Sequence, residues 1–157
     1  MSPVDHDLPS RVAAHPFLAG MNEPQMRILA DCAEAKCFEV GAMIFRAGDP
    51  ARGFYLLESG SIAVEGDAAG GATVAIDTVA AGEPLGWSWI FEPFVCQYGA
   101  RALEPTTAIF FDALRLAEHR GADLTLGHEL FKRMSQVMVR RLNAARAKLL
   151  EATIPDR

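Results

Sequence analysis

The stretch GFYLLESGSI, residues 53–62, decides the fold class of this 157-residue chain. Two short apolar runs flank a Ser-Gly pair, which is the pattern of two strands joined by a tight turn. Upstream, GAMIFRAGDP at residues 41–50 has the same character, and further runs follow at residues 73–77, 100–104 and 106–112. Short strands that alternate with turn signals in this rhythm predict an antiparallel barrel or sandwich.

Helical patterns flank the predicted strands on both sides. Residues 11–37 are predicted to be helical, with Asn22 as the N-cap of a helix that has Pro24 near its first turn. A short helix is predicted at residues 113–119 and a long one at residues 126–152. The long helix carries one apolar stripe at spacings of three and four residues: Leu130, Met134, Met138, Leu142, Ala145 and Leu149.

Composition limits the classes of function. Half of the residues are hydrophobic, which suffices for a sizeable core, and the formal net charge of −5 argues against a protein whose whole surface binds nucleic acid. Three cysteines, an odd number, favour a reducing compartment over a disulfide framework. Residues 1–10 are polar and are expected to form a flexible lead, and no run is apolar enough for a signal peptide or a membrane span. We therefore expect a soluble cytoplasmic protein.

Four segments occur in an order that is typical of one family. They are HPFLAG at residues 15–20, a G-x-x-I-F-x-x-G-D/E-P pattern at residues 41–50, an F-Y-x-L-x-x-G-x-V/I pattern at residues 54–62, and RALEPTT at residues 101–107. Together they resemble the cyclic-nucleotide-binding domain of the catabolite-activator and Fnr superfamily, and the resemblance covers nearly the whole chain.

The resemblance implies a mainly β fold with flanking helices, in which a cupin-like jelly-roll (double-stranded β-helix) barrel holds a nucleotide and a C-terminal helix pairs two subunits. We expect the barrel with its N-terminal helices over residues 11–125, and a dimerisation helix with a tail over residues 126–157. The expected homodimer contacts are Leu130, Met134, Met138, Leu142 and Leu149. We expect no DNA-binding helix-turn-helix after this helix, so the chain resembles a stand-alone sensor.

The ligand-binding cassette departs from the family pattern. In the family, a segment of the form F-G-E-x-A-L-L-x-x-x-x-R-S/T-A holds the ligand: its glutamate accepts a hydrogen bond from the ribose, and its arginine bonds the cyclic phosphate. Here the segment, called the cassette below, reads LGWSWIFEPFVCQYGARALE at residues 85–104. The ungapped register puts Trp87 at the glutamate, Cys96 at the arginine and Gln97 at the serine or threonine. A slide by two residues puts Tyr98 at the arginine instead.

The missing charges weaken the case for cAMP or cGMP. Arg101 replaces the family arginine only after a shift that spoils the match of the following strand. A hydrogen bond to a charged group contributes roughly 1.5–3 kcal/mol, so the loss of the arginine alone lowers affinity about 10- to 100-fold. We therefore expect no tight binding of ordinary cyclic nucleotides and no cofactor. Weak anion affinity remains conceivable through backbone donors in a short helix after Gly86.

Two functions remain open at this point. The first is a regulatory sensor whose pocket suits a planar or apolar ligand, with Ser88, Cys96 and Gln97 as its polar groups. The second is a dimeric interaction module, docked onto a partner protein, whose pocket is filled by the aromatic residues of the cassette. The candidate ligand-binding residues are Gly86, Trp87, Ser88, Trp89, Cys96, Gln97, Tyr98 and Arg101.

We expect neither an enzyme nor a metal site. A cupin-type metal centre needs histidines on inward strand positions, and all four histidines lie outside the predicted strands. Cys96 has no histidine nearby in the sequence to activate it as a nucleophile, so a buried or pocket-lining thiol is expected. The cationic residues of the long helix are interpreted as a solvated face.

Overall fold

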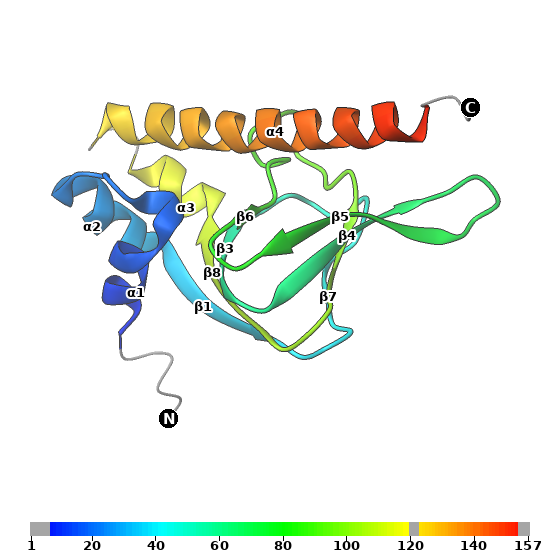
Figure 1. Ribbon diagram of the computed structural model, residues 1–157. Coiled ribbons are helices and arrows are strands. Elements are labelled where there is room, and N and C mark those ends of the chain that lie inside the picture. Colours follow the sequence, from blue (N-terminus) through cyan, green and yellow to red (C-terminus); the bar gives the residue numbers. More distant parts are fainter. Residues whose placement is uncertain (1–6, 120–122, 154–157) are drawn as a thin grey trace. The chain divides into compact units, whose positions relative to one another are not determined.

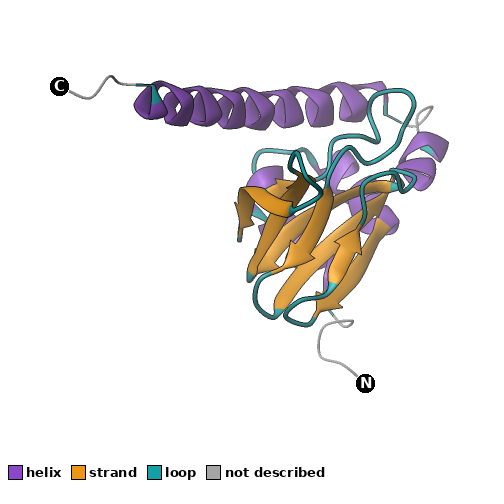
Figure 2. Ribbon diagram, turned by 90° about the vertical axis from the view of Figure 1, so that its right-hand side faces the viewer, coloured by secondary structure: helices purple, strands orange, loops and turns teal. Residues whose placement is uncertain are grey.

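The computed structural model describes residues 7–119 and 123–153. The chain divides into two compact units, one up to Asp123 and one from Leu124 onward, two residues from the boundary that the sequence predicts. The first unit contains a roll of antiparallel strands with helices on either side of it in the chain (Figure 1; Figure 2). The second unit is a single long helix.

The elements of the first unit are α1 (Leu8–Ala14), η1 (Pro16–Leu18), α2 (Glu23–Cys32), β1 (Ala33–Phe38), β2 (Met43–Phe45), β3 (Gly53–Ser59), β4 (Ser61–Asp67), β5 (Thr73–Ala80), β6 (Pro84–Leu85), β7 (Gly99–Ala102), β8 (Thr106–Asp112) and α3 (Ala113–Glu118). The second unit is α4 (Leu124–Ala152). None of the described helices is long and apolar enough to cross a membrane.

The strands form two four-stranded sheets, in the orders β1-β8-β3-β6 and β2-β7-β4-β5. All pairings between named strands are antiparallel. A buried cluster draws on both sheets: Leu57, Ile62, Val79, Leu85 and Ala100. The predicted jelly-roll arrangement with flanking helices is therefore confirmed.

The turn at Gly60 carries the chain from one sheet to the other. It joins β3 and β4, which belong to different sheets, and the link from β7 to β8 crosses between the same sheets beside it. The two crossings are bonded to each other, because Leu103 N–H donates to the Ser61 carbonyl at 2.9 Å and the hydroxyls of Ser59 and Thr107 lie 2.6 Å apart. Gly60 has φ of +90°, and a Cβ there would lie 2.6 Å from the Pro105 carbonyl oxygen.

Two predicted boundaries at the N-terminal side are corrected. Helix α1 begins at Leu8, inside the predicted lead, and Pro9 occupies its first turn, where a missing N–H costs nothing; residues 1–6 lie outside the described part. Residues 33–37, predicted to be helical, form β1, because this segment pairs with β8 along its whole length. Helix α2 has the predicted N-cap, since Asn22 and Gln25 exchange side-chain and backbone hydrogen bonds in a capping box.

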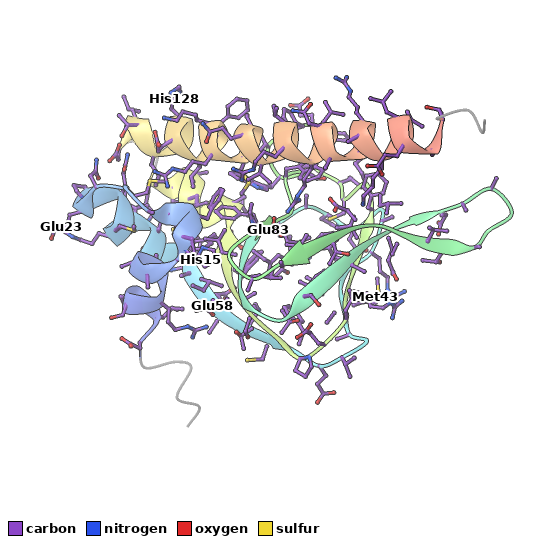
Figure 3. All side chains as sticks on the ribbon, viewed as in Figure 1. His15, Glu23, Met43, Glu58, Glu83 and His128 are labelled. Atoms are coloured by element: carbon purple, nitrogen blue, oxygen red, sulfur yellow. The ribbon has the colours of Figure 1, made fainter. Side chains whose placement is uncertain are left out.

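The N-terminal helices are attached to β3 through buried polar contacts. His15 is buried, its Nε2 lies 2.7 Å from the Leu57 carbonyl oxygen, and its Nδ1 accepts a hydrogen bond from Phe17 N–H. Because Nδ1 is an acceptor, the ring is neutral and Nε2–H is the donor. Burial lowers the pKa of His15, which agrees with a neutral ring. The guanidinium of Arg11 pairs with the carboxylate of Glu58; Figure 3 labels Glu58 and His15.

The close packing at Gly60 predicts a difference in stability between two glycine-to-alanine variants. Gly60 and Gly41 both have positive φ, so alanine strains the backbone at either position by about 1–2 kcal/mol. A Cβ at Gly60 also overlaps Thr106 and Pro105, whereas a Cβ at Gly41 meets nothing within 4 Å. We expect Gly60→Ala to lower the free energy of unfolding by roughly 1–3 kcal/mol more than Gly41→Ala, as measured by urea denaturation. Equal losses would show that the crossing is not tightly packed.

Candidate functional site

A cavity of about 570 Å³ lies within the first unit. Strands from both sheets and the cassette contribute to its wall. Its lining residues are Glu34, Lys36, Ile44, Phe45, Asp49, Pro50, Ala51, Arg52, Gly53, Tyr55, Gly86, Ser88, Cys96, Phe110 and Asp112. This volume is in the range of pockets that hold small molecules.

Aromatic rings form one wall of the cavity. The ring of Tyr55 lies 4.8 Å from that of Phe110 and 6.4 Å from that of Phe45, measured between centroids. Burial raises the pKa of Tyr55 to about 12, so its phenol is neutral at physiological pH. A planar apolar ligand would find stacking partners here, because offset aromatic pairs at such distances are favourable.

Backbone hydrogen bonds hold the second half of the cassette at the cavity. Cys96 N–H donates to the Asp49 carbonyl, and the Cys96 carbonyl accepts from Gly48 N–H, both at 2.8 Å. Ala51 N–H donates to the Phe94 carbonyl at the same distance. Burial, reinforced by the nearby Asp49, raises the pKa of the Cys96 thiol, so it is neutral. A neutral thiol thus borders the cavity at the position that the ungapped register predicts for the family arginine.

Charged side chains also line the cavity. Glu34, Asp49 and Asp112 contribute three negative charges, and Lys36 and Arg52 contribute two positive ones, so the lining carries a net charge of −1. The ammonium group of Lys36 also interacts with its neighbours: it lies 4.0 Å from the carboxylate of Glu34 and 5.9 Å from the centroid of the Phe110 ring. The lining therefore carries charges of both signs, with a slight formal excess of negative charge.

The first half of the cassette forms turns instead of the short helix that the resemblance implies. Gly86 has φ of +94°, and single turns follow in which Ile90 N–H donates to Trp87 and Phe94 N–H donates to Phe91. Pro93 has no N–H to donate, which prevents a continued series of helical hydrogen bonds at this point. The expected short helix after Gly86 is therefore absent from the cassette, and its N–H groups do not form a helical N-terminus.

The structure brings three of the eight candidate ligand residues to the cavity: Gly86, Ser88 and Cys96. Trp87, Trp89, Gln97 and Tyr98 are not part of the lining. Trp89 stacks on Phe54 with ring centroids 5.2 Å apart, and Gln97 and Tyr98 are exposed.

Arg101 also lies outside the lining. Its guanidinium donates to both carboxylate oxygens of Glu65 at 3.3 Å and to the Gly41 carbonyl at 2.9 Å. These contacts join β7 to β4 and to the turn before β2. The arginine therefore supports the sheet, and the geometry does not direct it at a ligand.

The aromatic wall was missed by sequence reasoning. Tyr55 lies between two buried residues on β3, but Phe110 lies in a run of four buried residues on β8, so no period of two marks both positions. Both faces of these strands are apolar, and alternation alone does not tell which face borders a cavity.

The chain belongs to the cyclic nucleotide-binding domain family, whose model matches residues 35–119, more than half of the chain. A candidate cyclic nucleotide-binding protein from Geobacter metallireducens GS-15 is similar in structure, with 26% identity, a TM-score of 0.73, and 85% of this chain and 97% of that chain covered. A cyclic nucleotide-binding domain from Methylobacillus flagellatus KT has 17% identity and a TM-score of 0.77, with 96% and 84% covered. No curated protein matches the chain.

A third similar structure comes from a cAMP-independent kinase. The regulatory subunit of a cAMP-independent protein kinase A from Trypanosoma brucei has 23% identity and a TM-score of 0.64, with 80% of this chain and 44% of that chain covered. A triple variant of that subunit, in which one substitution is threonine to arginine, is bound to cAMP in its A site.

Proposed function

We propose that this protein is a ligand-sensing regulatory module whose cavity binds a planar, neutral or cationic small molecule in place of a cyclic nucleotide. The observation that carries the proposal is the cavity of about 570 Å³, which is lined by Tyr55, Phe110 and the neutral thiol of Cys96. Membership of the family supports a regulatory function, and the lining residues indicate which kind of ligand the cavity would bind.

The lining supports an uncharged or cationic ligand. A cyclic phosphate would meet Asp49 and Cys96 where the family pattern has a guanidinium, and Trp87 at the position of the ribose-binding glutamate is not part of the lining. Each missing charge-assisted hydrogen bond removes roughly 1.5–3 kcal/mol of binding free energy. The subunit from Trypanosoma brucei is an example of this fold in a cAMP-independent regulator whose triple variant is bound to cAMP.

The open cavity favours the sensor over the interaction module with a filled pocket. The rings that would fill it are Phe91, Phe94 and Tyr98, and these are 47%, 44% and 43% exposed and absent from the lining. The Trp89 ring stacks on Phe54 and does not line the cavity. The space bordered by Ser88 and Cys96 is therefore available to a ligand.

Three molecules with one ring system and different charges test the ligand class. We expect tryptamine, a cation, and neutral indole to bind at least about 10-fold more tightly than the anion indole-3-acetate, because the lining is negative and aromatic. Isothermal titration of the full chain measures the three affinities. Preferred binding of indole-3-acetate would contradict the proposed charge of the ligand, and no binding of any of the three would contradict the planar class.

A matched pair of variants localises this binding. Ser88→Trp places a ring at the cavity wall and is expected to abolish binding of indole. Gln97→Trp adds the same ring at an exposed cassette position outside the lining and is expected to leave the affinity unchanged. Equal effects of both variants would place the binding elsewhere.

The cassette register generates a gain-of-function prediction. The wild-type chain is expected to bind cAMP and cGMP no more tightly than millimolar, and the variant Cys96→Arg is expected to gain at least about 10-fold for cAMP, because one charge-assisted contact is restored at the cavity wall. Cys96→Met, which adds volume without charge, is the control for cavity shape. Micromolar binding by the wild type would show that other residues supply the phosphate and ribose contacts.

We further propose that the protein acts as a homodimer through α4. Leu130, Met134, Met138, Leu142 and Leu149 follow one face of this helix. Leu130 and Met134 are already buried within the chain, whereas Leu142 and Leu149 are 49% and 64% exposed. The exposed leucines toward the C-terminal end of the helix are the part of the stripe that a paired helix can bury.

The dimer is tested by charge insertion on that face. Leu142→Glu is expected to convert the dimer to a monomer in analytical ultracentrifugation, because two carboxylates would meet across a two-fold contact. Asn143→Glu inserts the same charge on the opposite side of α4 and is expected to leave the dimer intact. A wild-type chain that is monomeric at micromolar concentration would overturn the proposal.

A further inference from the structure

Three potential metal ligands meet at the ends of two helices in the first unit. Asp31 and Cys32 end α2, and His119 is the C-cap of α3. The His119 Nε2 atom lies 3.0 Å from Asp31 Oδ2. With the Cys32 Sγ atom included, the three donor atoms lie within 4.8 Å of one another. None of the three residues lines the cavity.

Hydrogen bonds between the two helices hold this cluster in place. The Asp112 carboxylate caps α3 by accepting from the backbone N–H groups of Leu114 and Arg115. The Arg115 side chain in turn donates to the backbone carbonyl of Asp31 at the end of α2. The three donor atoms therefore converge on a scaffold that is fixed without any ion, which limits the rearrangement that binding requires.

The donor set matches the preference of zinc. Imidazole, thiolate and carboxylate are the protein ligands of Zn²⁺, at about 2.0–2.3 Å from the ion. Donor atoms at those distances from one tetrahedral ion lie roughly 3–4 Å from each other. The pair of His119 and Asp31 already has this spacing, and Cys32 Sγ, within 4.8 Å of the others, reaches it with a shift of at most roughly 1–2 Å.

The surrounding charge favours a cation. The charged groups that act on the Cys32 thiol are Asp31, Asp112, Glu118 and Arg115. Three carboxylates and one guanidinium leave a local charge of −2 before the thiol is considered. Cys32 itself is buried and Asp31 is exposed, so the cluster has a closed inner side and an open outer side.

We propose that Asp31, Cys32 and His119 bind one Zn²⁺ ion, with a water molecule as the fourth ligand on the exposed side. On binding, the thiol proton of Cys32 passes to solvent and the sulfur becomes a thiolate ligand. The sequence predicts no metal site, because a cupin-type centre needs histidines on strands. These ligands instead come from two helix ends that lie 88 residues apart in the chain. The ion would cross-link α2 to the end of α3.

Cobalt(II) provides the test, because a thiolate ligand to Co²⁺ gives a charge-transfer absorption in the near ultraviolet and tetrahedral Co²⁺ gives visible bands. The probe is Co²⁺ added to the reduced, tag-free full chain after removal of metal with a chelator. We expect both absorptions to saturate at one Co²⁺ per chain and to disappear when one equivalent of Zn²⁺ is added. Absence of the charge-transfer band would overturn the site.

Variants assign the ligands. His119→Gln and Asp31→Asn change side chains at the open side of the cluster and are expected to weaken Co²⁺ binding more than about 100-fold, beyond the loss that follows from removing an outer-shell partner. Cys32→Ala is expected to abolish the charge-transfer band. Because Cys32 is buried and its replacement can unfold the chain, His119→Gln is the deciding variant. Unchanged binding in His119→Gln would overturn the proposal.

Two controls separate the site from other donors. Cys37→Ser removes an exposed thiol on β1, and His128→Gln removes an exposed imidazole on α4. Both variants are expected to retain the wild-type spectrum and stoichiometry. Loss of the signal in either control would show that Co²⁺ binds elsewhere and would contradict the assignment.

Discussion

The fold depends on the close contact at Gly60, where the chain changes sheet twice in the same place. The β3–β4 turn and the β7–β8 link pass each other at a distance that leaves no room for a Cβ atom. Thr106 fills the crossing with its hydroxyl, which donates to the carbonyls of Ser61 and Glu104. Both links between the sheets therefore meet in one close contact, at the end of the β3–β8 pair in one sheet and of the β4–β7 pair in the other.

The cassette contributes side chains that determine the chemical character of the cavity. Its backbone is bonded to the loop at residues 48–51, and Cys96 borders the cavity. The ungapped register predicts that the two charge-bearing family positions hold the Cys96 thiol and the Trp87 indole. Arg101, the nearest guanidinium in the cassette, is committed to Glu65 and the Gly41 carbonyl. The cavity thus has an aromatic wall and a slight excess of negative formal charge, and the proposed ligand class rests on these two properties.

Sequence reasoning succeeded where the determinants are local. The turn signals in the sequence predict the positions of β2 to β5 and β8, and Asn22 predicts the start of α2. Each of these signals lies within a few residues of the element that it sets. It failed for β1, since Ala, Glu and Lys in residues 33–37 favour a helix locally and only pairing with β8 makes the segment a strand. In the site, the cassette register placed Gly86, Ser88 and Cys96 at the cavity. Tyr55, Phe110 and the cluster of Asp31, Cys32 and His119 arise from contacts between distant segments, which a single sequence does not display.

The stacking of Trp89 on Phe54 has an optical consequence. The chain contains only two tryptophans, Trp87 and Trp89, and both lie in the cassette. Light absorbed by indole therefore reports on this one segment and on no other part of the molecule. Trp89 is held between the cassette and β3 without bordering the cavity, and its Nε1–H is buried with no hydrogen-bond partner among the described residues. Its emission is consequently set by the environment of the cassette, so the protein carries its own fluorophore at the segment that a bound ligand would have to touch.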